Sequence, residues 1–279
     1  MTASPHFYFL LVFVLSVPFY LLGAAGGRLP GLPMLPASAL MAFVPMVAAL
    51  FLVLRRRSID GIVAELGRAP NFGWQASVGW YLTALLFMPL VCGLEFGVLR
   101  LTGSDLPMPQ VVPGEALFFF VAFFVGAIGE EAGWQGYAYP ALRSHLNALA
   151  AAVVLGAVWA LWHVIPFVQL GRSADWIFWH SLSAVALRIV IVWLIENTGK
   201  SIFIAVLFHT MINVSWALFP IAGSYYDPFV TFSILVPASG LIVVLWGAPT
   251  LAGRGAQRGA ETAVRPKEGA SCVQNKPGK

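Results

Sequence analysis

Long apolar stretches separated by short polar breaks fill most of the chain. A helix needs about 20 mostly apolar residues to cross the roughly 30 Å hydrocarbon core of a bilayer. Eight stretches reach or approach this length, and the breaks between them carry charges or are rich in Gly and Pro. The pattern therefore predicts eight membrane-spanning segments, at residues 7–25, 37–54, 76–99, 115–135, 148–170, 179–195, 201–219 and 229–248.

Two of these segments fit the pattern less well than the others. Segment 179–195 is short and contains Arg188, and segment 37–54 contains Pro45. Backbone groups cannot stay unpaired in lipid, so spanning segments are either helices or strands of a closed barrel. The alternating segments of about ten residues that a barrel requires do not occur. The sequence therefore predicts an all-α, polytopic membrane helix bundle of about eight transmembrane helices.

Composition supports a membrane protein and excludes other classes. Hydrophobic residues make up 59% of the chain and charged residues 10%, compared with roughly 45–50% and about 25% in soluble domains. Six Lys or Arg and two Glu in residues 252–279 account for the whole net charge of +4. The rest of the chain is balanced and has no basic face for nucleic acid. We therefore expect a transmembrane domain over residues 1–251 and a polar, disordered cytoplasmic tail over residues 252–279.

The N-terminus and the cysteines add two expectations. Residues 1–6 contain no Lys or Arg before the first apolar run, so residues 7–25 are expected to be a retained span rather than a signal peptide. Cys92 lies in an apolar stretch and Cys272 in the polar tail, so no disulfide framework is expected.

The distribution of Lys and Arg predicts the orientation in the membrane. Cytoplasmic loops carry an excess of these residues, and an even number of spans places both termini on one side. With both termini in the cytoplasm, twelve Lys and Arg are cytoplasmic, whereas Arg28, Arg100 and Arg172 lie outside. We therefore predict an N-in, C-in, multi-pass protein of the bacterial cytoplasmic (inner) membrane.

Few polar side chains lie within the predicted spans, and ionisable groups in a membrane usually have a function. His180 lies at the outer start of its span, where an interfacial position is expected. Glu95 lies near the outer end of the third span, and is either interfacial or a partner of Arg188. The candidates are Glu95, Glu130, Glu131, His163, His180, Arg188 and His209, together with the amide side chain of Asn213.

Two adjacent carboxylates, Glu130 and Glu131, lie near the end of the fourth span. Successive helical residues point about 100° apart, so one carboxylate can face a central cavity while the other contacts a neighbouring helix. This arrangement suggests one catalytic and one structural acid. The alternative is a helix end that reaches the membrane interface, where Glu is tolerated.

Two further spans each carry polar groups spaced by one helical turn. Trp159 and His163 share one helix face, as do His209 and Asn213. Two hydrogen-bond donors on one face suit the stabilisation of a developing oxyanion. The alternatives are a core His163 that donates to a carbonyl, and interhelical hydrogen bonds from His209 and Asn213 that hold the bundle together.

A Glu, two His and an Asn from three different spans together suggest a hydrolytic site. Burial favours the protonated form of a carboxyl group, which suits a Glu for general-base catalysis near neutral pH. The same residues also fit Zn²⁺, because two His and one Glu form a known catalytic zinc set, here Glu130, His163 and His209. The HExxH pattern is absent from the sequence. A metal-free site and a zinc site are both compatible with these residues.

Three motifs resemble, in order, those of one protein family. The segments EEAGWQG (130–136), WALWH (159–163) and HTMIN (209–213) resemble the motifs EExxxR, FxxxH and HxxxN/D. These motifs define the type II CAAX prenyl endopeptidases and bacteriocin-processing enzymes, the CPBP or ABI family. The resemblance covers about residues 115–220. It implies an intramembrane protease, often labelled a metalloprotease, for which a metal-independent glutamate mechanism is favoured.

The resemblance also implies roles for individual residues. Glu130 and His163 would activate the attacking water, and His209 and Asn213 would form the oxyanion site. Glu131 would support this geometry.

Two positions depart from the family motifs. Trp159 stands where the family has Phe, which is an exchange of one aromatic residue for another. Gln135 stands where the family has Arg, and Gln brings no charge to orient a carboxylate. Arg188 is the only Lys or Arg inside the predicted spans. We hypothesise that it pairs with Glu131 or Glu95, the alternative being a side chain that snorkels to the interface.

The sequence thus predicts a membrane-embedded, glutamate-type endopeptidase that needs no cofactor and cleaves a peptide or a membrane-anchored protein. Prenylated CAAX proteins, bacteriocin-like peptides and membrane regulators are all compatible substrates. One rival is a non-catalytic immunity or scaffold protein that retains the fold, which Gln135 supports. The other is a proton-coupled transporter, for which broken helices and an internal repeat are expected and neither is visible.

Overall fold

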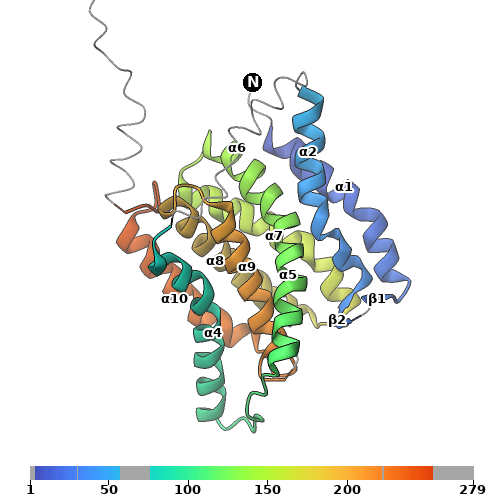
Figure 1. The fold of residues 1–279 in the computed structure, drawn as a ribbon, viewed down its shortest axis with the longest axis vertical. Coiled ribbons are helices and arrows are strands. Elements are labelled where there is room, and N and C mark those ends of the chain that lie inside the picture. The colour runs from blue at the N-terminus through green and yellow to red at the C-terminus, as the bar shows by residue number, and fades with distance from the viewer. Residues whose placement is uncertain (1–3, 30, 57–75, 222, 254–279) are drawn as a thin grey trace, which may run out of the picture.

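The computed structural model describes residues 4–29, 31–56, 76–221 and 223–253. In this part of the chain, seven helices are long and apolar enough to cross a membrane, and an eighth apolar helix, Ile202–Leu218, is shorter. The sheet in these residues is a single two-stranded hairpin. The prediction of an all-α, polytopic membrane helix bundle is therefore confirmed (Figure 1).

Each of the eight predicted segments corresponds to helical structure. A hairpin of β1 (Arg28–Leu29) and β2 (Leu32–Pro36) follows the first helix. The helices are α1 (Pro5–Ala24), η1 with α2 (Ala37–Phe43 and Val44–Arg56), α4 (Val78–Leu101), α5 (Pro113–Gly133), α7 (Ala148–Gln169), α8 (Ala174–Asn197), α9 (Ile202–Leu218) and α10 (Pro228–Trp246). Arg57, Arg68, Cys272 and all but the first two residues of the predicted tail lie outside the described residues.

Helices α8 and α9 form the centre of the bundle. Helix α8 packs against α7 and α10, whereas α9 packs against α4 and α5, and α5 in turn packs against α2 (Figure 1). The three sequence motifs lie on α5, α7 and α9. The packing therefore brings the motif-bearing helices together around α8.

Helix α8 is longer than the predicted segment 179–195 because its polar first turns are also helical. Ser173 caps the helix by accepting a hydrogen bond from the backbone N–H of Trp176 at 3.2 Å. Asp175 lies in the first turn, where a carboxylate interacts favourably with the helix dipole. The helix has 24 residues, which is long enough to cross a bilayer.

The second span begins as a 3₁₀-helix because of Pro45. Proline has no N–H, so the carbonyl of Met41 cannot receive the usual bond from a residue four positions later. The N–H of Val44 donates to this carbonyl instead. The last turn of the 3₁₀-helix Ala37–Phe43 keeps this bonding pattern, and α2 starts at Val44.

Glycines on α5 allow it to lie very close to the second span. A Cβ atom on Gly129 would lie 2.7 Å from the carbonyl oxygen of Ala42, and one on Gly133 would overlap the backbone of Pro45. Small residues at helix contacts are common in membrane bundles. The span then continues through a π-helical turn, Trp134–Ala138, and α6 (Tyr139–Arg143). Its apolar helical segment thus runs from Pro113 to Arg143, so the two Glu lie within it.

Candidate active site

A buried ion pair connects α5 to α8. Arg188 Nη1 donates to both carboxylate oxygens of Glu131, at 3.0 Å to Oε1 and 2.8 Å to Oε2. Neither side chain is exposed. His209 on α9 completes the network, with its Nδ1 at 2.7 Å from Glu131 Oε1. A buried carboxylate is tolerated when charged and polar donors surround it in this way.

This geometry decides between the alternatives for Arg188. The guanidinium pairs with Glu131 and not with Glu95, and its burial excludes a snorkelling side chain. Glu95 on α4 is also buried, but its carboxylate accepts hydrogen bonds from the backbone N–H of Asp227 and the hydroxyl of Thr231, both at 2.7 Å. Glu95 therefore holds the start of α10 and is not the partner of Arg188.

Trp159 on α7 contacts four groups of the site, namely Glu130, Arg188, His163 and His209. Its Nε1 donates to Glu130 Oε2 at 2.7 Å. The Arg188 guanidinium carbon lies 4.4 Å from the centre of the indole ring, within the range of a cation–π interaction. The rings of His163 and His209 lie edge-on to the indole, at 5.2 and 5.3 Å between centroids. One large side chain thus fixes the relative positions of Glu130, Arg188 and both imidazoles.

Hydrogen bonding restricts the protonation of the two histidines. His163 Nδ1 lies 2.8 Å from the carbonyl oxygen of Trp159. A carbonyl only accepts, so Nδ1 carries the hydrogen and Nε2 of a neutral ring is a hydrogen-bond acceptor. Nδ1 of His209 likewise donates to Glu131. Nε2 of His209 therefore becomes a donor only when that ring carries both hydrogens.

The predicted catalytic residues meet at one cavity of about 320 Å³. Glu130, His163, His209 and Asn213 all line it, whereas Glu131 does not. The wall is otherwise mainly apolar, as is typical of ligand-binding cavities. The structure thus gives the adjacent Glu side chains different environments, since one faces the cavity and the other is held by Arg188 and His209.

Gln135 takes no part in the hydrogen bonding of this site. Its side chain is buried in the π-helical turn, and neither its Nε2 nor its Oε1 has a hydrogen-bond partner within the described residues. Arg188 instead supplies the cation that holds Glu131. The position that carries Arg in the family motif and the position that carries the charge here are therefore on different helices.

His180, for which the sequence suggests an interfacial position, lines the cavity. It lines the wall, stacks on Trp176 at 4.6 Å between ring centroids, and its Nδ1 lies 3.1 Å from the Tyr226 hydroxyl. Residues of the hairpin, including Leu32 and Leu35, also line the cavity. The sequence signal for them is leucines in a Gly- and Pro-rich break, a pattern that by itself indicates only a loop.

The alternative zinc set is not arranged as a metal centre. Among the described residues, no group of three or more His, Cys, Asp or Glu side chains is placed to hold a metal ion. Glu130, His163 and His209 each have one polar atom bound to another protein group. Metal-bound His and Glu side chains commonly make such a second hydrogen bond, so these bonds do not decide between a metal-free site and a zinc site.

The fold and the site define a class of protein: a multi-pass membrane protein with a buried Glu, His and Asn site at an apolar cavity. Comparisons with known proteins narrow this class. Residues 112–215 match the family described as type II CAAX prenyl endopeptidase Rce1-like. The chain is also 26% identical to a protein of Methanococcus maripaludis named CAAX prenyl protease 2, over 153 residues that cover 50% of this chain and 54% of the relative.

These matches confirm the resemblance that the three motifs indicate, to the CAAX-protease (CPBP) family. The matched region contains all three motifs and the four helices that build the site. The chain spans about half the length of the curated relative that it matches.

Proposed function

We propose that this protein is an intramembrane endopeptidase that hydrolyses a peptide bond in the 320 Å³ cavity. The observation that carries the proposal is the meeting of Glu130, His163, His209 and Asn213 at one apolar cavity from three helices. The family and the relative named above support the same class of activity.

Glu130 and His163 activate the attacking water in this proposal. Trp159 holds Oε2 of Glu130 by a hydrogen bond, so Oε1 takes a proton from the water. Nε2 of His163 accepts a hydrogen bond from the other O–H of the water and so orients the water. It is free to accept because Nδ1 of the same ring donates to the Trp159 carbonyl. The water oxygen attacks the carbonyl carbon. The C–N bond then breaks, and the amine leaves with the proton that Glu130 returns.

His209 and Asn213 stabilise the oxyanion that forms during the attack. They are one helical turn apart on α9 and both line the cavity. The Asn213 amide donates in its neutral form, whereas His209 donates from Nε2 as an imidazolium whose Nδ1 is bound to Glu131. Donors fixed in place before the reaction give the largest stabilisation of developing charge.

Glu131 and Arg188 position the other residues and do not contact the substrate. Glu131 fixes the ring of His209, and Arg188 holds Glu131 and stacks on Trp159. The substrate is a peptide or the segment of a membrane-anchored protein, and the protein works within the bilayer of the bacterial cytoplasmic membrane without a cofactor.

A peptide-cleavage assay tests this function. Wild type, Glu130→Ala and His209→Ala are purified in nanodiscs and incubated with a peptide library that is read by mass spectrometry. Wild type is expected to cleave, and both variants are expected to lose turnover. Turnover that survives both changes would overturn the proposed site.

The partnerless Gln135 favours a second candidate, a non-catalytic immunity or scaffold protein. A folded wild type that cleaves no peptide supports this candidate. Substrate-driven proton flux without cleavage would instead favour a transporter.

A further inference from the structure

The cavity occupies one half of the bundle. Its lining comes from the hairpin after α1, from η1, from the C-terminal halves of α7 and α9, from the N-terminal half of α8, and from residues 122–130 of α5. All of these parts except that of α5 lie towards the end of the bundle where α1 ends and α8 begins, opposite to the N-terminus (Figure 1). The cavity lining includes Leu29, Leu35, Leu170 and Trp216 from this end.

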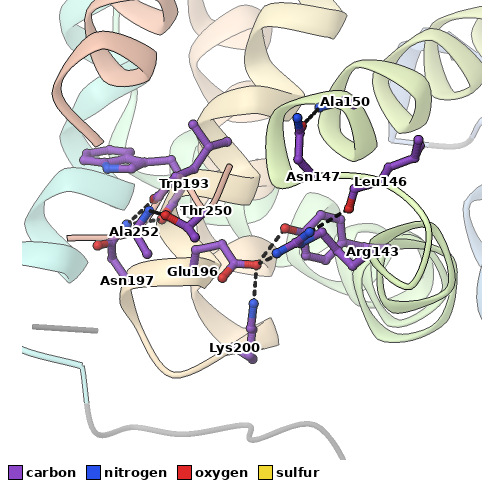
Figure 2. Close-up of polar contacts among 12 residues, drawn as sticks. Arg143, Leu146, Asn147, Ala150, Trp193, Glu196, Asn197, Lys200, Thr250 and Ala252 are labelled. Carbon is purple, nitrogen blue, oxygen red and sulfur yellow. Dashed lines mark hydrogen bonds and ion pairs between the residues drawn. The ribbon is translucent and has the colours of Figure 1, made fainter. Parts of the chain in front are cut away.

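The opposite end of the bundle carries the polar cluster shown in Figure 2. Glu196, near the end of α8, accepts a hydrogen bond from Tyr139 and forms ion pairs with Arg143 and Lys200. Asn197 binds the chain after α10 through the Leu251 carbonyl and the Gly253 N–H, both at 2.8 Å. The last described residues after α10 therefore lie at this end of the bundle.

The start of α4 lies at the same end. Trp80, in its first turn, packs edge-on against Trp193 of α8, with 5.0 Å between ring centroids. The second span also ends there, in Arg55 and Arg56. The last residues of α2 and the first residues of α4 thus both lie at the side of the bundle that carries the polar cluster.

Lys and Arg are distributed very unequally between the two ends. The cavity end carries Arg28, Arg100 and Arg172. The other end carries Arg55, Arg56, Arg143 and Lys200, and the segments that leave it contain eight further cations in sequence, two between α2 and α4 and six in residues 254–279. An excess of Lys and Arg marks the cytoplasmic side of a membrane protein. The end opposite to the cavity is therefore the cytoplasmic end.

We propose that the cavity of this protein opens towards the extracytoplasmic side of the membrane, and that its substrate is an exported peptide or the extracytoplasmic segment of a membrane protein. The substrate part of this inference rests on the proposed function. The direction in which the cavity opens rests on the distribution of Lys and Arg between the two ends of the bundle. The C-terminus of a cytoplasmic protein would approach the bundle from the end with the polar cluster, and no residue of that cluster lines the cavity.

The apolar wall agrees with a substrate that leaves the outer leaflet of the bilayer. Leu40 and Phe43 of η1 and Val125 of α5 line the cavity and are 41%, 38% and 47% exposed. They lie on the lipid-facing surface of the outer half of the bundle. The cavity wall therefore includes apolar side chains that are also exposed on the outside of the bundle.

Single-cysteine labelling tests the direction of the cavity without any need for activity. In a background with Cys92→Ala and Cys272→Ser, the variants are Met108→Cys, His145→Cys and Leu170→Cys. Met108 is 68% exposed at the cavity end, His145 is exposed at the other end, and Leu170 lines the cavity. Each variant is treated with a membrane-impermeant maleimide in right-side-out and in inside-out vesicles. Labelling after solubilisation in SDS gives the total reactive cysteine.

We expect Met108→Cys and Leu170→Cys to react at least tenfold faster in right-side-out vesicles, and His145→Cys to react at least tenfold faster in inside-out vesicles. The reverse pattern would overturn the proposal. Labelling of Leu170→Cys from the same side as His145→Cys would also overturn it, because the cavity would then open to the cytoplasm.

A second arm distinguishes failure of the inference from failure of the proposed function. An impermeant peptide that wild type cleaves in nanodiscs is added to vesicles of both orientations. Cleavage at least tenfold faster in right-side-out vesicles is expected, and faster cleavage in inside-out vesicles contradicts the inference. If wild type cleaves no peptide in nanodiscs, the proposed function fails, and the cysteine labelling still decides the direction of the cavity.

Discussion

Arg188 on α8 donates from one nitrogen to both carboxylate oxygens of Glu131 on α5, and neither side chain reaches the surface. The two residues are 57 positions apart in the sequence. This ion pair links the central helix of the bundle to the helix that carries both Glu. Because Glu131 also binds His209, the pair controls the orientation of a residue that lines the cavity.

Removal of the cation is expected to destabilise the protein, and a cation at position 135 is expected to restore it. Arg188→Gln leaves the Glu131 carboxylate buried with only His209 as a partner, and loss of one member of a buried pair lowers the free energy of unfolding by about 3–5 kcal/mol. Position 135 is one turn after Glu131, so the added change Gln135→Arg returns a guanidinium. Thermal unfolding in detergent and peptide turnover measure both effects.

The single change Gln135→Arg is the control for this swap. It adds a second cation beside a carboxylate that Arg188 already neutralises, so it should lower stability on its own. The double variant is expected to be more stable than either single variant. Additive losses in the double variant would show that the two positions do not serve the same carboxylate.

Glu130→Gln is expected to abolish turnover with little change in the melting temperature. The amide oxygen of Gln still accepts the hydrogen bond from Trp159, but the side chain no longer takes a proton from water. Loss of a general base lowers kcat by roughly 10²–10⁴-fold. Glu95→Gln is the matched control, because Glu95 is equally buried but does not line the cavity. It should retain turnover, and an equal loss in both variants would contradict the role of Glu130.

Most of the fold could be predicted from the apolar segments alone, because lipid requires a helix wherever such a segment spans the bilayer. The apolar pattern places the start of the sixth span at residue 179, whereas α8 begins at Ala174, because Asp175 in the first turn is polar. The sequence limits the partner of Arg188 to Glu131 or Glu95, and only the packing of α8 against its neighbours decides between these two residues. The hairpin at the cavity could not be predicted, since no periodicity marks which loop folds back over a site.

Trp159→Phe is expected to reduce turnover without abolishing it. Phe keeps the aromatic ring against Arg188 and both histidines but loses the hydrogen bond from Nε1 to Glu130. A hydrogen bond to a charged group contributes about 1.5–3 kcal/mol, so kcat should fall roughly tenfold to a hundredfold. Trp162→Phe is the control. Trp162 Nε1 donates to the Ser16 hydroxyl at 2.7 Å, and neither residue lines the cavity. That variant should lose stability but keep its turnover per folded protein.

Asn213→Ala is expected to lower kcat and leave KM almost unchanged. The Asn213 amide would contact the oxyanion, which exists only after water has attacked the substrate carbonyl. Removal of one oxyanion donor typically lowers kcat by about 10²–10³-fold. Steady-state kinetics separate this effect from a loss of substrate binding. A rise in KM at constant kcat would instead assign Asn213 to the binding of the uncleaved peptide.

Chelator treatment is expected to leave turnover unchanged. Glu130, His163 and His209 are the candidate zinc ligands, and no cluster of the described residues is placed to hold a metal ion. Turnover of nanodisc samples is measured after dialysis against a strong zinc chelator and again after zinc is restored. Loss of turnover with the chelator and its return with zinc would replace the water activation by Glu130 and His163 with metal-assisted hydrolysis. Constant turnover throughout would support the metal-free mechanism, in which Glu130 takes the proton from the water.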